Sequence, residues 1–226
     1  PSTYRRSVYV FSKRTIPLPM LETFDRPDTM SSCARRNRST IAPQALILMN
    51  NEFIGTQAKH FAQRLEREAG ADTKAQVTLA YELARKKIAS FVGASDPNEI
   101  VFVRGATEAI NLLAYSWGGL LQSGDRILLS QVEHHSNIVP WQMLCDRKKA
   151  ILRVIPISDK GELDMEAYQN LLSSKTKLVS VVHTSNALGT INPVKEITQS
   201  AKSVNAYVLI DGAQAAPHQK IDVQEI

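Results

Sequence analysis

The feature that most constrains the fold is a regular alternation of short apolar segments and longer amphipathic segments from residue 99 to residue 226. The apolar segments lack the in–out alternation of a half-exposed strand, which indicates strands that are buried on both faces. Such strands alternating with helices are typical of βαβ units. The sequence therefore predicts an α/β fold in which a mostly parallel sheet has flanking helices. The expected strands are residues 99–103, 126–131, 151–157, 177–184 and 206–211, and the expected helices are residues 107–117, 138–148, 163–174 and 193–204.

The first part of the chain has a different texture. Residues 1–50 are rich in Pro, Ser and Arg and show no sustained hydrophobic period, which predicts irregular structure. Residues 51–69 and 73–92 repeat apolar side chains at helical spacing. We therefore expect an irregular and then helical segment of unknown function over residues 1–80, ahead of a separate domain over residues 81–226. The residues expected to begin or end the two helices are Asn50 or Asn51, Gly70 and Gly93.

The net charge of +5 is concentrated near the N-terminus. Residues 1–40 contain eight Lys and Arg against three Asp and Glu, and the remaining residues contain nineteen of each kind. The basic residues are scattered among Pro, Met and Ser, so a solvated surface is favoured over a nucleic-acid site. No apolar run reaches the roughly 18 residues of a membrane span, and the N-terminus lacks the apolar core of a signal peptide. We therefore expect a cytoplasmic protein without membrane contact.

The two cysteines, Cys33 and Cys145, form neither a CxxC pair nor a metal-binding cluster. We expect ordinary reduced thiols and no metal site. Cys145 falls within a helical pattern, where a small buried side chain is common.

Polar side chains follow the expected strands, at the edge where open α/β sheets bind ligands. Ala106 and Thr107 open a helix, where free backbone N–H groups and a hydroxyl predict a phosphate site, unless Thr107 merely caps the helix. His134 and His135 follow a later strand. Adjacent imidazoles point in different directions, so a ring stacked on a flat ligand is favoured over a shared metal, with a surface or capping role as the alternative.

The last two strands lead to an amide and a carboxylate. Asn186 and Gly189 mark a turn in which the amide can hydrogen-bond a phenol-like oxygen, with turn chemistry alone as the alternative. Asp211 can pair with a protonated ring nitrogen and so turn an aromatic ring into an electron sink, with Gln214 on the same side. A capping role for Asp211 in the next turn is the alternative. Together the strand ends describe one ligand, a phosphorylated, hydroxylated pyridine.

Four stretches in this order resemble the class V aminotransferase family: FVRGATEAINLLAYSWG, GDRILLSQVEHHSNIVPWQML, VVHTSNALGTINPVKEI and VLIDGAQAAPH. Within it, residues 81–226 are most similar to cysteine desulfurases of the selenocysteine lyase-like, iron–sulfur assembly type. The resemblance implies an incomplete large domain of a fold type I pyridoxal phosphate enzyme. It also implies a homodimer that removes sulfur from cysteine, giving alanine and an enzyme persulfide, with a sulfur-acceptor protein as a further partner.

The resemblance assigns each strand-end residue a role toward pyridoxal phosphate. Thr107 would bind the phosphate beside the Ala106 backbone, His134 would stack on the ring, Asn186 would approach the ring hydroxyl, Asp211 would pair with the pyridine nitrogen, and Gln214 would assist at the ring oxygen.

The same resemblance places the Schiff-base lysine, the persulfide cysteine and the substrate-binding arginine beyond Ile226. The chain is therefore expected to be a fragment that lacks the catalytic residues and is inactive alone. Residues 1–80 resemble the C-terminal end of an uncharacterised domain of large bacterial proteins with cytochrome-c-like modules, which indicates a fusion. The alternatives are an inactive fusion or interaction product with a relic cofactor site, and another class V member such as a selenocysteine lyase.

Overall fold

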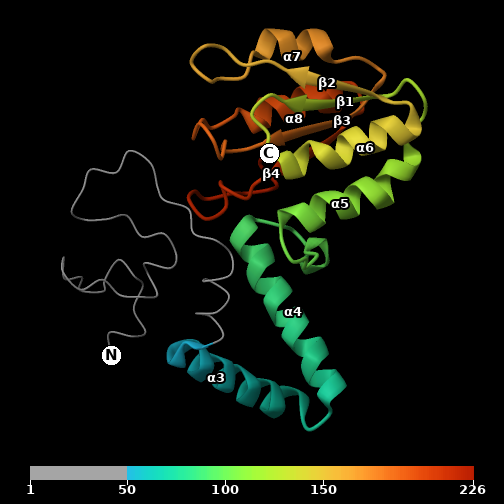
Figure 1. Cartoon of the computed structure of the whole chain (residues 1–226). Coiled ribbons are helices and arrows are strands. Elements are labelled where there is room, and N and C mark those ends of the chain that lie inside the picture. Colours follow the sequence, from blue (N-terminus) through green and yellow to red (C-terminus); the bar gives the residue numbers. More distant parts are fainter. Residues whose placement is uncertain (1–49) are drawn as a thin grey trace, which may run out of the picture. The chain divides into compact units, whose positions relative to one another are not determined.

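The computed structural model describes residues 50–226, and the chain divides into two compact units, Pro1–Tyr81 and Glu82–Ile226. Helix α3 spans Glu52–Ala69, and helix α4 spans Thr73–Val92 and so crosses the boundary between the units (Figure 1). The irregular structure expected for residues 1–50 lies almost wholly outside the described residues.

The ends of α3 follow from local chemistry. The Asn51 side chain accepts hydrogen bonds from the backbone N–H groups of Phe53 and Ile54 at 3.0 and 3.3 Å. These N–H groups have no partner within the first turn, so the cap satisfies donors that the helix cannot. Gly70 ends the helix with φ 71°, a backbone conformation that favours glycine. Both predicted helices and this pair of caps are confirmed.

The second unit is built on a four-stranded parallel sheet with strand order β2-β1-β3-β4. At one end of the central pairing Arg126 lies opposite Thr176, and at the far end of the sheet Val182 lies opposite Asp211. The predicted mostly parallel sheet is confirmed. The strands are β1 (Arg126–Ser130), β2 (Ile151–Ile155), β3 (Thr176–Val182) and β4 (Tyr207–Asp211).

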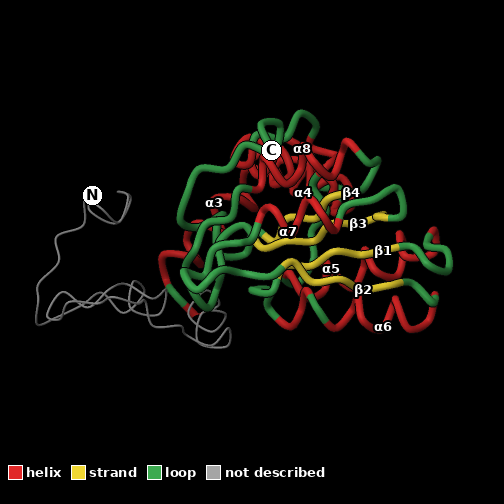
Figure 2. Tube along the Cα trace, turned by 90° about the horizontal axis from the view of Figure 1, so that it is seen from above, coloured by secondary structure: helices red, strands yellow, loops and turns green. Residues whose placement is uncertain are grey.

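Helices cover both faces of this sheet, giving three layers. Figure 2 shows α6 on one side of the strands and α8 on the other. Helix α5 shares one buried cluster with α6, and helix α7 shares the other with α8. The helices that follow the strands agree with the sequence prediction within a few residues. Their bounds are α5 (Ala106–Ser116), α6 (Val139–Lys148), α7 (Met165–Leu171) and α8 (Val194–Ser203), with short 3-10 helices η3 (Pro97–Glu99), η4 (Trp117–Leu120) and η5 (His135–Asn137).

The alternation of side chains along β1 explains why the two faces both need a cover. Ile127 and Leu129 pack in the cluster that contains Trp141 of α6, whereas Leu128 packs in the cluster that contains Tyr168 of α7. All of these side chains are fully or almost fully buried. Burying one such side chain stabilises the fold by about 1.5–3 kcal/mol.

The prediction of a strand at residues 99–103 is wrong. Glu99 ends η3, and residues 100–103 pair with no strand in the described part of the chain. Val101 is 65% exposed, so its apolar side chain has found no core here. A strand requires a neighbour to receive its backbone hydrogen bonds, and an apolar pattern alone does not reveal whether that neighbour exists.

Candidate functional site

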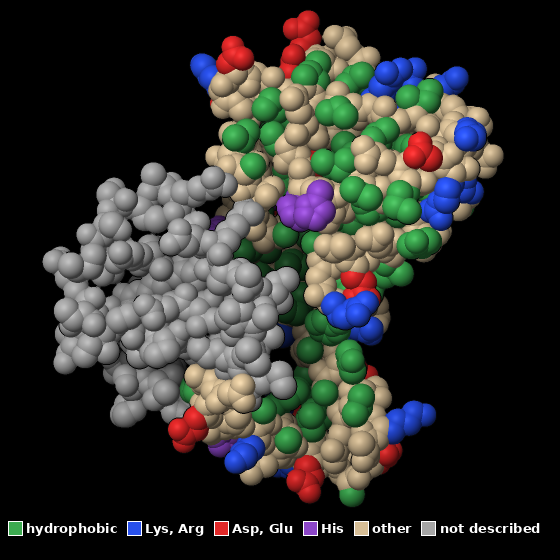
Figure 3. Space-filling model, in the orientation of Figure 1, with side chains coloured by type: hydrophobic (Ala, Val, Ile, Leu, Met, Phe, Trp, Pro, Cys, Tyr) green, Lys and Arg blue, Asp and Glu red, His purple; other side chains and the backbone are tan. Residues whose placement is uncertain are grey.

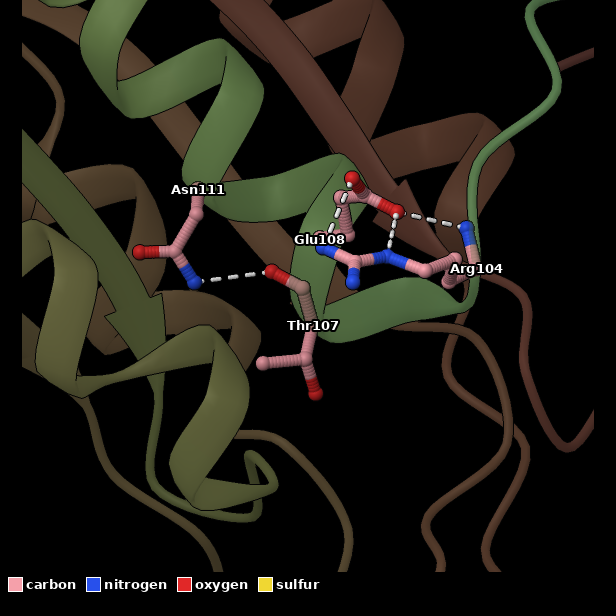
Figure 4. Close-up of polar contacts among 4 residues, drawn as sticks. All are labelled: Arg104, Thr107, Glu108 and Asn111. Carbon is pink, nitrogen blue, oxygen red and sulfur yellow. Dashed lines mark hydrogen bonds and ion pairs between the residues drawn. The ribbon is translucent and has the colours of Figure 1, made fainter. Parts of the chain in front are cut away.

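The first element of the site is the start of α5. Gly105 precedes the helix with φ 158° and ψ 175°, a conformation open mainly to glycine, and no atom lies within 4 Å of the position a Cβ would take. Ala106 is the first helical residue. Gly105 occupies the N-cap position and Thr107 is the second helical residue, so the alternative that Thr107 caps the helix is wrong. The Thr107 side chain points away from Arg104 and Glu108 (Figure 4).

An ion pair flanks this helix start. The Arg104 Nε lies 3.1 Å from a Glu108 carboxylate oxygen, and the Arg104 backbone N–H donates to the same oxygen at 2.6 Å (Figure 4). The hydrogen bonds from the Arg104 side chain and backbone lower the pKa of Glu108. The guanidinium thus offsets the only carboxylate in the first turn of α5, which leaves the helix N-terminus suited to an anion.

The second element is the loop after β1, which carries His134 and His135. His134 is half-buried, and its ring centroid lies 4.0 Å from that of the exposed His135. Histidine side chains are visible on the face shown in Figure 3. His134 Nδ1 lies 2.7 Å from the Ser136 hydroxyl, which can donate or accept, and the backbone N–H of Ser136, which can only donate, points at the same nitrogen from 3.3 Å. In the neutral ring the proton is therefore assigned to Nε2.

Beneath these histidines lies a buried polar network that the sequence did not single out. Glu133 is 9% exposed and accepts hydrogen bonds from the Ser130 hydroxyl, from Asn137 Nδ2 at 2.7 Å and from the Val182 N–H at 2.7 Å. Desolvation raises the pKa of Glu133, and the nearby Asp211 charge adds to the rise. The sequence signal that could have identified this network is Glu133 itself, a carboxylate three residues after Ser130 at the end of an apolar strand.

The third element is the turn after β3. Ser185 organises it, because its hydroxyl accepts from the backbone N–H groups of Ala187 and Leu188 at 3.3 and 3.2 Å. Gly189 closes the turn with φ 79°. The turn chemistry proposed as the alternative for Asn186 is therefore supplied by its neighbour, and Asn186 itself is half-buried at the rim.

His183, which directly follows β3, is a second residue that sequence reasoning missed. Its backbone N–H donates to the Asp211 carbonyl at 2.9 Å, which joins the ends of β3 and β4. Its Nδ1 is buried without a hydrogen-bond partner in the described residues, and burial lowers its pKa.

The fourth element is Asp211, which ends β4 and is 7% exposed. Its Oδ1 accepts from the Ala213 N–H at 2.9 Å, so the predicted capping role is present. Its Oδ2 has no hydrogen-bond partner within residues 50–226, so capping does not use up the carboxylate. Gln214 lies in the turn that follows, where its carbonyl oxygen is 2.7 Å from His218 Nδ1.

The strand order places these elements at one location. The chain moves from β1 outward to β2, then crosses back to β3 on the other side of β1, so the direction of winding reverses between β1 and β3. Helix α5 packs against η5, which follows His134. His134, Asn186 and Asp211 follow three adjacent parallel strands at their carboxyl ends, which is where doubly wound sheets bind ligands.

Two other kinds of site have no support in the described residues. Within residues 50–226 no group of three His, Cys, Asp or Glu side chains is arranged to hold a metal ion, and no helix is long and apolar enough to cross a bilayer. Cys145 is buried in α6 as expected, whereas Cys33 lies outside the described part.

The fold and the strand-end residues define an α/β protein whose candidate site lies at the switch point of a parallel sheet. The family model for class V aminotransferases matches residues 39–226, and the chain belongs to this family. The match begins well before residue 81, so the family similarity extends into the segment expected to be separate. The resemblance of residues 1–80 to an uncharacterised domain stays a prediction.

Curated relatives and a solved structure agree with this family. A probable cysteine desulfurase of Synechocystis is 51% identical over 152 residues, which cover 67% of this chain and 36% of the relative. A probable cysteine desulfurase of Mycolicibacterium paratuberculosis is 40% identical, covering 96% of this chain and 34% of the relative. The crystal structure of the cysteine desulfurase CsdA from Escherichia coli matches with a TM-score of 0.64 at 29% identity, covering 92% of this chain and 45% of that one. The chain thus spans about a third of the length of the curated relatives it matches.

Proposed function

We propose that this chain is the part of a pyridoxal phosphate-dependent cysteine desulfurase that holds the cofactor. The observation that carries the proposal is the meeting of His134, Asn186 and Asp211 at the carboxyl ends of three adjacent parallel strands. These are the side chains that a flat, hydroxylated pyridine requires, and the two curated relatives named above are probable cysteine desulfurases.

The residues fit pyridoxal phosphate in two independent ways. At the phosphate end, the open space beside Gly105 and the uncapped hydroxyl of Thr107 leave the first N–H groups of α5 accessible to an anion. At the ring end, Asp211 is a buried carboxylate with one oxygen still unpartnered among the described residues, which suits a protonated ring nitrogen.

Each residue contributes a distinct action in this proposal. When bound, pyridoxal phosphate supplies an electron sink for the bonds around the substrate carbon. Asp211 holds the proton on the pyridine nitrogen, because a buried carboxylate favours a cationic partner. His134 covers one ring face and excludes water from it. Asn186 and Gln214 orient the ring through its oxygen, and Thr107 with the Ala106 N–H fixes the phosphate.

Binding of the cofactor is tested with the chain itself. In equilibrium dialysis against pyridoxal phosphate, Asp211→Asn should weaken binding about tenfold, or ~1.4 kcal/mol, because a neutral amide replaces a charge-assisted hydrogen bond. Asp159→Asn, at an exposed turn, is the matched control and should bind like the wild type. Equal affinity in the Asp211→Asn variant, or no binding by the wild type, would contradict the proposal.

The substrate is tested with the product of the complete reading frame that contains this chain. We propose that it releases sulfur from L-cysteine, works as a homodimer and passes sulfur to an acceptor protein. Sulfide release from L-cysteine in the presence of a thiol reductant, with alanine formed in equal amount, is the expected result. Selenide release from L-selenocysteine without activity on L-cysteine would favour the selenocysteine lyase alternative instead.

A further inference from the structure

The buried carboxylate of Glu133 joins three parts of the chain that meet at the ligand edge. It bonds back to Ser130, the last residue of β1, and forward to Asn137 of η5, so it closes the loop that carries His134. It also accepts the N–H of Val182, the last residue of β3, across a separation of 49 residues.

Asn137 makes a second connection between the same two parts. Its Oδ1 accepts from Ser180 of β3 at 2.7 Å and from Trp141 Nε1 of α6 at 2.8 Å. Asn137 is completely buried, so neither of these donors has water as an alternative partner at that oxygen. The loop is thus fixed to β3 at two positions that are two residues apart.

Glu133 contacts β3 at Val182, the position next to Asp211 in the sheet. Val182 lies directly opposite Asp211 in the pairing of β3 with β4. A single side chain therefore connects the loop that carries His134 to the strand position beside Asp211. In the proposed function these are the two groups that face the same pyridine ring, one on its plane and one at its nitrogen.

Resting on the proposed function, we propose that Glu133 is a positioning residue that fixes His134 relative to Asp211. It touches no ligand in this role. Its carboxylate determines the height and orientation of the His134 imidazole over the ring that Asp211 holds by the nitrogen. Burial opposes an ionised carboxyl here. The Asn137 Nδ2 and Val182 N–H groups can only donate, so they require acceptor oxygens at Glu133.

The direction of the hydrogen bonds makes Glu133→Gln an informative change. A glutamine oxygen can replace the acceptor for Val182 and Ser130, but its NH₂ group then faces the NH₂ group of Asn137. Asn137 cannot reverse its amide to adapt, because its oxygen already accepts from two donors. The variant preserves the size of the side chain and breaks the network.

The test has one readout that needs no cofactor. In protein labelled with nitrogen-15 in its histidines, long-range nitrogen–proton spectra report which ring nitrogen of His134 carries the proton. The wild type should show the Nε2–H form, because the Ser136 backbone N–H can only donate to Nδ1 and the Ser136 hydroxyl can donate to it as well. Glu133→Gln should show a mixture of forms, and Glu166→Gln, an exposed glutamate on α7, should match the wild type.

The second readout is pyridoxal phosphate affinity, together with the circular dichroism that bound cofactor acquires from its surroundings. Glu133→Gln should raise the dissociation constant about tenfold and alter the induced signal. An unchanged His134 tautomer with affinity within about twofold of the wild type would overturn the proposal. If the wild type does not bind the cofactor, the proposed function fails, and the tautomer readout alone then decides the role of Glu133.

A milder variant covers the case in which Glu133→Gln does not fold. Ser180→Ala removes one connection between Asn137 and β3 and leaves the carboxylate in place. It should show the same change in His134 and in affinity, to a smaller extent. A Ser180→Ala protein that matches the wild type in both readouts would count against the proposal.

Discussion

At the scale of single residues, the neighbours of a buried ionisable group decide whether its charged form is stabilised. Glu133 and Asp211 are carboxylates at the ligand edge and have donors around them. Cys145, in contrast, lies in the apolar cluster between α6 and the sheet. Desolvation raises the pKa of Cys145 to about 11, with a smaller contribution from Asp146. The nucleophilic thiolate is therefore scarce at this position.

This predicts that Cys145 is unreactive in the folded protein. In a Cys33→Ser background, where Cys145 is the only thiol, about one thousandth of it should be ionised near pH 8. A disulfide reagent such as dithiobisnitrobenzoate should label it only as fast as the protein unfolds, and adding denaturant should give one thiol per chain. Rapid labelling without denaturant would show that the thiol is accessible.

His183 should make the stability of the protein depend on pH. Burial lowers its pKa from the ordinary value of 6.5, so the folded state favours the neutral ring. Its contribution is present above the unfolded-state pKa and is lost as pH falls through the folded-state pKa. The difference in urea midpoint between wild type and His183→Gln should therefore shrink or reverse between about pH 7.5 and pH 5.5. A difference that stays constant across this range would contradict the assignment.

At the scale of secondary-structure elements, short-range chemistry is read from sequence more reliably than pairing. The caps of α3 at Asn51 and Gly70 act through neighbouring backbone atoms, and both were predicted. The segment 100–103 has an equally apolar sequence but no described partner strand, so its local pattern was misleading. Lys149, which ends α6 with φ 57°, shows a third case, because nothing in its side chain indicates a left-handed conformation.

Lys149 is a place where glycine should stabilise the protein. A left-handed backbone strains any residue with a Cβ, so Lys149→Gly should raise the free energy of unfolding by about 0.5–1 kcal/mol. Gln142→Gly, at an exposed interior position of α6, is the opposite control and should lower it by about 1 kcal/mol. Urea unfolding of the three proteins measures both changes. Destabilisation by Lys149→Gly would show that the lysine side chain contributes more than the strain costs.

At the scale of the whole molecule, the sequence indicated the parallel sheet and the order of the strand ends, because buried strands and polar ends are local patterns. It did not indicate the strand order, and so it could not identify the pair between which the winding reverses. It also missed the Glu133 network, because Ser130, Asn137 and Ser180 look like ordinary polar residues until the strands bring them together. The cofactor roles predicted for the strand-end residues stay predictions; these residues are Ala106, Thr107, His134, Asn186, Asp211 and Gln214.

The hydrogen bond between Glu133 and Val182 also bears on the time at which the ligand edge forms. It joins residues 49 positions apart, and closing a loop of that length costs about 3 kcal/mol of chain entropy before any contact compensates. Helices such as α6 and α8 can form early from local contacts, but the pairing of β1 with β3 cannot. The ligand edge should therefore be among the last parts to form.

In a refolding experiment, the fluorescence of added pyridoxal phosphate should rise later than the helical circular dichroism signal. The rate of that fluorescence rise would then report the rate of the final folding step.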